Sequence, residues 1–341
     1  MRSIIKPLTS LRLFFMLMVL FSHSGKVSSF FLHPFFQEGY VGVGCFFILS
    51  GFIISYNYQE RFELKQVDSY SFWVARLARI YPLHIVTFLL SFFLVSYSFD
   101  QWHVIRKMIA QVFLLQAFVP NEDYYFSFNG PSWSLCCEML FYLLFPFFAI
   151  RITSLKRTVW LLICLVTCIG VGMLLTSQEH AKAIWYVNPF VRLPDFIVGM
   201  LLYRLYRSTS CTWSFRRASF FEVGVILLFI GFYICGSLGL IPMVFRYSIY
   251  YWLPISLLLY VFSYSKGAVS KLLSWRGFVL GGDISFSAYL IHILVFKAWE
   301  KYDLLQNLNF ILVLIFILVL SYFSYRYFER PANRFVKTVL K

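Results

Sequence analysis

Ten predominantly apolar runs, each roughly 20 residues long, constrain this 341-residue chain more than any other feature of its sequence. A helix needs about 20 apolar residues to cross the hydrocarbon core of a bilayer. With 60% hydrophobic residues and a mean hydropathy of +0.74, a soluble globule would expose too much apolar surface. We therefore predict an all-α, polytopic integral membrane protein with about ten transmembrane helices. The runs span residues 8–24, 40–58, 83–99, 133–150, 158–176, 189–206, 220–240, 248–264, 279–298 and 308–328.

Basic residues outnumber acidic ones by 30 to 15, which gives a formal net charge of +15. They occupy alternate gaps between the apolar runs rather than one patch, so we expect no nucleic-acid partner. Under the positive-inside rule these gaps face the cytoplasm, and so do both termini. The basic residues are Arg2 and Lys6; Arg61, Lys65, Arg76 and Arg79; Arg151, Lys156 and Arg157; Arg204, Arg207, Arg216 and Arg217; Lys266, Lys271 and Arg276; and Arg330, Arg334, Lys337 and Lys341.

Two apolar segments need separate interpretation. The segment 104–119 is too short to span, and a full crossing there would place the basic gap at 151–157 outside, so we predict a shallow or re-entrant helix. The run from Leu8 to Ser22 is interrupted by Arg12 and lacks a small-residue cleavage site, so we expect a retained first span rather than a signal peptide. No linker divides the chain, which predicts a single domain over 1–341.

The seven cysteines lie mostly inside apolar runs and show neither disulfide nor zinc spacing. We expect them to act as small buried hydrophobic residues. The sequence likewise lacks a P-loop, a metal-binding HExxH motif and a GxSxG hydrolase motif, so we expect no metal.

Ionisable side chains inside the first span are the first functional candidates, because burying them in a membrane is costly. Arg12 and His23 are eleven residues apart, which places them within about 20° of the same helix face and about 16 Å apart along the axis. Alternatives are that Arg12 extends to the interface and that His23 is a hydrogen-bonded structural residue.

The second span and the gap after it carry small and basic residues. Gly39, Gly42 and Gly44 with Ser50 and Gly51 form a small face suited to a ligand or to ordinary helix packing. In RLARIYP, Arg76 and Arg79 share one side of a helical turn that we expect to end before Pro82. Two guanidinium groups so placed suit a phosphate-rich ligand, although basic gaps also determine topology.

Three later stretches combine polar and aromatic residues at helical spacing. In GPSWSLCCEM, Ser134 and Glu138 lie four apart on one face, where a carboxylate must be paired, protonated or functional. In SFSAYLIH, Ser285, Tyr289 and His292 share a face, a pattern also common in helix packing. The closing FERP is interpreted as a helix end at Glu329, stopped by Pro331.

Taken in order, these motifs resemble the acyltransferase-3 family of membrane O-acyltransferases, which includes bacterial O-antigen and exopolysaccharide O-acetyltransferases. The resemblance rests on Arg12 with His23, FFILSGF, RLARIYP, WSLCCE, SFSAYLIH and FERP, and it runs from Leu8 to about Val336. It implies a multi-pass enzyme of the bacterial inner membrane. Some members carry an additional SGNH hydrolase-like domain, which we do not expect here.

The resemblance also implies an activity: transfer of an acyl group, most often acetyl, from cytosolic acetyl-CoA to a hydroxyl of a lipid-linked or nascent surface glycan. His23, Glu138 and Ser134 then match the family's catalytic positions, and Arg12, Arg76 and Arg79 its arginines for the acyl-CoA donor. We further expect Trp133, Tyr289 and His292 to contact the acceptor. Whether His23 acts as general base or becomes acylated stays open, as do the acceptor, the acyl chain and a homo-oligomer.

In this hypothesis the phosphates of coenzyme A meet Arg76 and Arg79, and Glu138 orients the His23 imidazole or holds the sugar. The competing hypotheses are a lipid-linked sugar flippase or small-molecule transporter, and a structural scaffold. A tunnel suited to a long donor favours the enzyme, whereas a cleft with alternating access favours transport.

Overall fold

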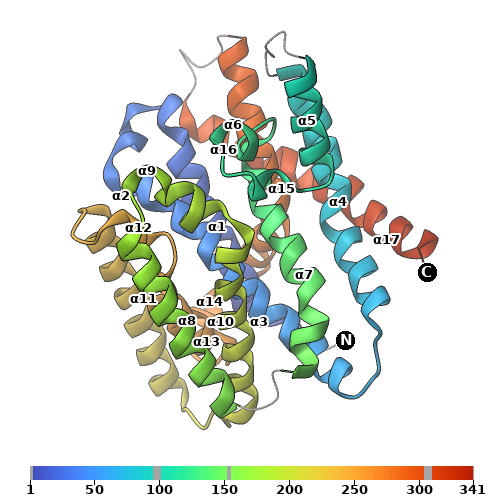
Figure 1. Cartoon of the computed structure of the whole chain (residues 1–341). Helices are drawn as coiled ribbons and strands as arrows, with labels where there is room; N and C mark the ends of the chain where they lie inside the picture. The colour runs from blue at the N-terminus through green and yellow to red at the C-terminus, as the bar shows by residue number, and fades with distance from the viewer. Residues whose placement is uncertain (1–2, 95–100, 152–154, 303–308, 341) are drawn as a thin grey trace.

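The computed structural model is a bundle of long helices (Figure 1) and describes residues 3–94, 101–151, 155–302 and 309–340. Within these ranges no β-strand occurs. The α-helices are α1 (Lys6–His23), α2 (Pro34–Gln37), α3 (Val41–Glu63), α4 (Ser69–Leu94), α5 (Gln101–Val112), α6 (Glu122–Tyr125), α7 (Trp133–Arg151), α8 (Leu155–Leu175), α9 (Gln178–Ala181), α10 (Pro189–Ser208), α11 (Phe215–Ser237), α12 (Met243–Arg246), α13 (Ile249–Ser263), α14 (Ala268–Leu273), α15 (Arg276–Lys301), α16 (Phe310–Phe323) and α17 (Arg330–Val339). Short 3₁₀ turns include η4 (Gln116–Phe118) and η5 (Gly130–Ser132), and π-helical turns form η6 (Lys182–Val187) and η8 (Ser324–Glu329).

The predicted all-α membrane architecture is confirmed. Eight helical segments of the described chain are long and apolar enough to cross a bilayer, and each overlaps one of the predicted spans. The predicted spans at 158–176 and 189–206 also fall on helices, α8 and α10, which do not meet that criterion over their whole length. The predicted residues 95–99 and 308 lie outside the described ranges. The total of about ten spans therefore stays a prediction.

Glycines let the central helices approach closely. A Cβ placed on Gly51 of α3 would lie 2.0 Å from the Phe196 carbonyl oxygen of α10, and one on Gly199 of α10 would lie 2.0 Å from the Ile48 oxygen of α3. Backbone contact this tight requires glycine on both helices. Helix packing therefore accounts for Gly51 in the small face predicted for the second span.

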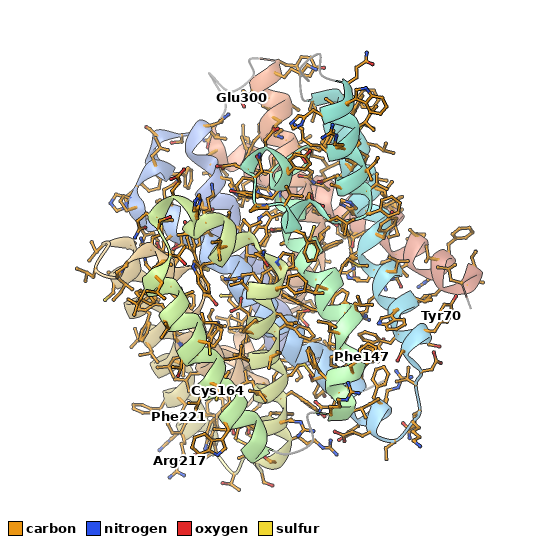
Figure 2. All side chains as sticks on the ribbon, viewed as in Figure 1. Tyr70, Phe147, Cys164, Arg217, Phe221 and Glu300 are labelled. Atoms are coloured by element: carbon orange, nitrogen blue, oxygen red, sulfur yellow. The ribbon has the colours of Figure 1, made fainter. Side chains whose placement is uncertain are left out.

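Large apolar side chains cover the outside of the bundle, as a lipid-facing surface requires (Figure 2). Phe147 and Phe221 are among them, at 47% and 37% exposed. The prediction that the cysteines are buried holds only for Cys45, Cys136 and Cys137, because Cys164 and Cys168 are exposed on α8. A thiol is apolar enough to face lipid, so an apolar run does not by itself predict burial.

Two prolines do not end helices where the sequence predicted. α4 continues through Pro82 to Leu94, so Arg76 and Arg79 lie inside one long helix rather than on a turn before it. The chain also stays helical past Pro331, the second residue of α17, which directly follows the π-helical turn η8. In Figure 1, α17 projects from the bundle beside α4.

Of the predicted segment 104–119, residues 104–112 lie in the 12-residue helix α5 and residues 116–118 form η4. α5 is about 18 Å long by its rise per residue, too short for a full crossing. α5 is tied to α6 by Asp123, whose carboxylate accepts hydrogen bonds of 2.7 Å from both Lys107 Nζ and His103 Nε2. The hydrogen bonds from Lys107 and His103 lower the pKa of Asp123 below its ordinary value.

Candidate active site

Three cavities follow one another along the central helix α3. The first, here called the vestibule, has a volume of about 660 Å³ and is lined by Asn57, Tyr58 and Arg61 of α3 with Arg76 and Lys337. The second, the arginine cavity, is about 120 Å³ and is lined by Phe46, Leu49 and Ser50 of α3. The third, the histidine cavity, is about 490 Å³ and includes Val43 of the same helix.

The cavities together span a membrane-sized distance. The vestibule and the arginine cavity share Ile53, Ile54 and Arg76 in their walls, so they adjoin. Arg61 and Val43 are 18 residue steps apart on α3, or about 27 Å at the rise of an α-helix. That length is close to the roughly 30 Å hydrocarbon thickness of a bilayer.

Three arginines converge on the arginine cavity. Arg12 comes from α1, and Arg76 and Arg79 come from successive turns of α4. Arg76 stacks over the Tyr58 ring at 5.2 Å, and its guanidinium lies 3.3 Å from the Tyr58 hydroxyl. Arg12 lines the cavity without a hydrogen-bond or ion-pair partner among the residues that the structure describes. Its donors therefore face the cavity rather than the membrane interface, and they suit an anionic ligand.

Two carboxylates border these arginines. Glu138 of α7 lines the cavity and accepts a 2.5 Å hydrogen bond from the Tyr142 hydroxyl one turn later. Glu329, which is 4% exposed, pairs with Arg79 at 2.9 Å and accepts a hydrogen bond from Ser287. The interpretation of Glu329 as a helix end was therefore incomplete, since this side chain holds one of the cavity arginines in place.

The histidine cavity contains His23 at the end of α1, together with Trp133, Tyr289 and several other aromatic residues. Arg12 and His23 thus lie on one side of α1 at two depths, as their spacing predicted. Two lysines, Lys182 and Lys297, also line this cavity. The structure places Trp133 and Tyr289 where an acceptor could contact them, and their role in binding it stays a prediction.

An aromatic pair separates the arginine cavity from the histidine cavity. Phe46 lines the first, Tyr289 lines the second, and their ring centroids are 6.1 Å apart. The Tyr289 hydroxyl is anchored by a 3.0 Å hydrogen bond to Ser134, whose own hydroxyl donates to the Pro131 oxygen at 3.0 Å. Ser134 is 5% exposed and lies behind Tyr289, and its predicted catalytic role stays untested.

The immediate partner of His23 is another histidine. His23 Nδ1 lies 3.0 Å from His292 Nε2 of α15, and the two rings are stacked with centroids 5.2 Å apart. Of the two roles predicted for Glu138, orienting His23 does not match its position, because Glu138 borders the other cavity and accepts a hydrogen bond from Tyr142; holding the sugar stays a prediction. His292 is 1% exposed and lies behind His23, so the predicted contact between His292 and the acceptor does not match its position.

Sequence reasoning overlooked two residues for which a signal existed. Tyr142 follows Glu138 by four residues, the spacing at which side chains of a helix meet. Lys297 lies inside the predicted span 279–298, and a cation there is a functional candidate by the same rule that selected Arg12. Lys297 lines the histidine cavity and donates a 2.6 Å hydrogen bond to the Phe128 oxygen.

Comparison with known proteins agrees with the resemblance of the sequence motifs to membrane O-acyltransferases. The model of a family described as an acyltransferase domain matches residues 6–326. The chain is similar to acyltransferase MdmB of Streptomyces mycarofaciens, with 28% identity over 76% of this chain and 68% of that protein.

Two further relatives are more distant or cover less of the chain. It is similar to O-acetyltransferase OatA of Staphylococcus aureus, with 23% identity over 87% of this chain and 53% of that protein. The chain therefore spans about half the length of OatA. An uncharacterized protein of Haemophilus influenzae is 30% identical over 46% of this chain and 69% of its own length. No solved structure matches the chain.

Proposed function

Because the chain belongs to the acyltransferase-3 family and is a multi-pass membrane O-acyltransferase, we propose that it transfers an acyl group, most often acetyl, from cytosolic acyl-coenzyme A to a hydroxyl of a cell-surface carbohydrate. The observation that carries the proposal is the series of cavities along α3, with arginines at one end and His23 at the other.

The arginine end suits the donor. Coenzyme A carries several phosphate groups, and the planar guanidinium pairs well with phosphate oxygens. In the proposed binding mode the nucleotide part occupies the vestibule near Arg61 and Lys337, and Arg76 and Arg12 lead the pantetheine arm inward. The thioester then reaches the Phe46–Tyr289 pair from the side of the arginine cavity.

The histidine end suits a sugar. Its volume of about 490 Å³ lies within the range of small-molecule sites, and its walls carry aromatic rings that can stack on a sugar face. In the proposed reaction His23 removes the proton from an acceptor hydroxyl, and the oxygen attacks the thioester carbonyl carbon. The carbon–sulfur bond breaks, and the coenzyme A thiolate accepts from His23 the proton that came from the acceptor hydroxyl.

The proposal also predicts how the protein is oriented in the membrane. Basic residues gather at the vestibule end, where Arg207 at the end of α10 pairs with Glu60 and Glu63 at the end of α3. Under the positive-inside rule this end faces the cytoplasm of a bacterial inner membrane, where acyl-coenzyme A is made. The histidine cavity then opens toward the acceptor on the opposite side.

The test uses membranes that contain the wild type, His23→Ala or His180→Ala, supplied with radiolabelled acetyl-coenzyme A and glycolipid from the source organism. His180 is an exposed histidine of α9 and serves as the matched control. We expect label in the glycan with the wild type and His180→Ala, and its loss with His23→Ala. Absence of label with folded wild type would refute acetyl transfer and favour the transporter hypothesis.

A further inference from the structure

The hydrogen-bonding contacts of the stacked His23 and His292 rings indicate which ring nitrogens carry protons. The ring nitrogens of His292 lie within hydrogen-bonding distance of two groups: Nδ1 is 3.1 Å from the Ala288 carbonyl oxygen, and Nε2 is 3.0 Å from His23 Nδ1. His292 is 1% exposed, so both ring nitrogens are committed to protein partners.

A carbonyl oxygen only accepts hydrogen bonds, so His292 Nδ1 must carry a proton. In a neutral imidazole the other nitrogen then has a lone pair, which makes His292 Nε2 an acceptor. The hydrogen between the two rings therefore belongs to His23 Nδ1. By the same rule, neutral His23 has its lone pair on Nε2, the nitrogen that is not used by His292.

We propose that His292 is a positioning residue that holds His23 in the Nδ1–H form, so that the His23 Nε2 lone pair faces the histidine cavity. Because α15 is buried along this face, the Ala288 carbonyl sets the proton on His292, and His292 in turn sets the proton on His23. The role of that lone pair as general base rests on the function proposed above.

The arrangement differs from a catalytic triad in the group behind the base. In a triad a carboxylate accepts the hydrogen bond from the histidine, whereas here the acceptor is a neutral imidazole. When a substrate hydroxyl gives its proton to His23 Nε2, the Nδ1–H stays donated to His292. The departing thiolate then removes the Nε2 proton, and both rings return to their starting forms.

Nitrogen-15 NMR of histidine-labelled protein in detergent, at about pH 8 where an ordinary imidazole is neutral, tests the proton positions without any substrate. The signals are assigned by their loss in His23→Gln and in His292→Gln. We expect His23 and His292 both to show the Nδ1–H form, and His23 to lose it in His292→Phe. An Nε2–H form at His23 in the wild type would overturn the proposal.

Kinetics test the consequence for catalysis. His292→Phe keeps the ring packing but removes the acceptor, and we expect kcat to fall by roughly 100-fold or more while the donor KM stays within about threefold. His292→Gln offers an amide oxygen in place of Nε2, and we expect it to retain at least about tenfold more activity than His292→Phe. Equal kcat values for the two folded variants would overturn the positioning role. Full activity of His23→Ala would instead refute the proposed base and leave the NMR result standing.

Discussion

The buried ion pair between Arg192 and Asp195 provides a prediction whose size can be worked out from contacts. Both side chains are 1% exposed and lie on one face of α10, and Arg192 Nη2 is 2.9 Å from Asp195 Oδ2. Asp195 also accepts hydrogen bonds from Ser248, at 2.9 Å, and from Trp252. The pair therefore joins α10 to the start of α13, which makes its loss a test of how this half of the bundle is held together.

We expect Asp195→Ala to lower the free energy of unfolding by about 3–5 kcal/mol, because it leaves the Arg192 cation buried without a counter-charge. The lost neutral hydrogen bonds account for about 1 kcal/mol each, so the uncompensated charge is the larger effect. At about 2 °C per kcal/mol for a chain of this size, the apparent unfolding temperature falls by about 6–10 °C. Tryptophan fluorescence during heating in detergent measures this shift.

Two further variants separate the charge from the packing. The double variant Arg192→Met with Asp195→Leu removes both charges, and we expect it to recover part of the stability that Asp195→Ala loses. Glu122→Ala breaks the exposed pair with Lys182 and should cost less than about 1 kcal/mol. A double variant as unstable as Asp195→Ala would refute the argument from buried charge.

Other predictions concern the donor, the helix crossing and pH. Arg76→Ala should raise the KM for acyl-coenzyme A by roughly 10–150-fold through loss of a charge-assisted hydrogen bond, as steady-state kinetics would show; an unchanged KM would contradict the proposed donor site. Gly199→Val should abolish folded protein in detergent chromatography, because its Cβ would overlap the Ile48 oxygen, whereas Gly231→Ala, with open space around it, should not. Because hydrogen bonds lower the pKa of Asp123, its contribution to stability is present above the unfolded pKa of about 3.9 and is lost as the pH falls below it. The gap in unfolding temperature between the wild type and Asp123→Asn should therefore narrow only below about pH 4, and a gap that does not depend on pH would contradict this role.

The sequence predicted the helices well because apolar length is a local property. Each predicted span overlaps a helix of the described chain, but several helix ends were misplaced. α4 begins at Ser69, well before the apolar run that starts at residue 83. Its residues Arg76 and Arg79 line an internal cavity, so this stretch is helical although it is polar. A rule based on apolar length cannot distinguish a polar loop from a polar helix segment that faces a cavity.

The candidate site was predicted in part for a related reason. The spacing of Arg12 and His23 on one helix follows from helical periodicity, and the structure confirms it. The contact between His23 and His292 joins positions 269 residues apart, and the pair of Arg79 and Glu329 joins positions 250 residues apart. Such contacts depend on how α1 packs on α15 and how α4 packs on η8, which local periodicity does not determine.

The aromatic pair of Phe46 and Tyr289 has a consequence for the electrical insulation of the membrane. Water that entered the cavities from both sides in the proposed topology would approach this pair, and much of the membrane potential would then fall across it. Moving one elementary charge through 100 mV is worth about 2.3 kcal/mol. A neutral acyl group would pass the aromatic pair without this electrical work. The polyanionic coenzyme A of the proposed reaction would need this work for each of its charges. The same two rings would thus pass the group to be transferred while keeping its carrier, and the ion gradients, on the original side.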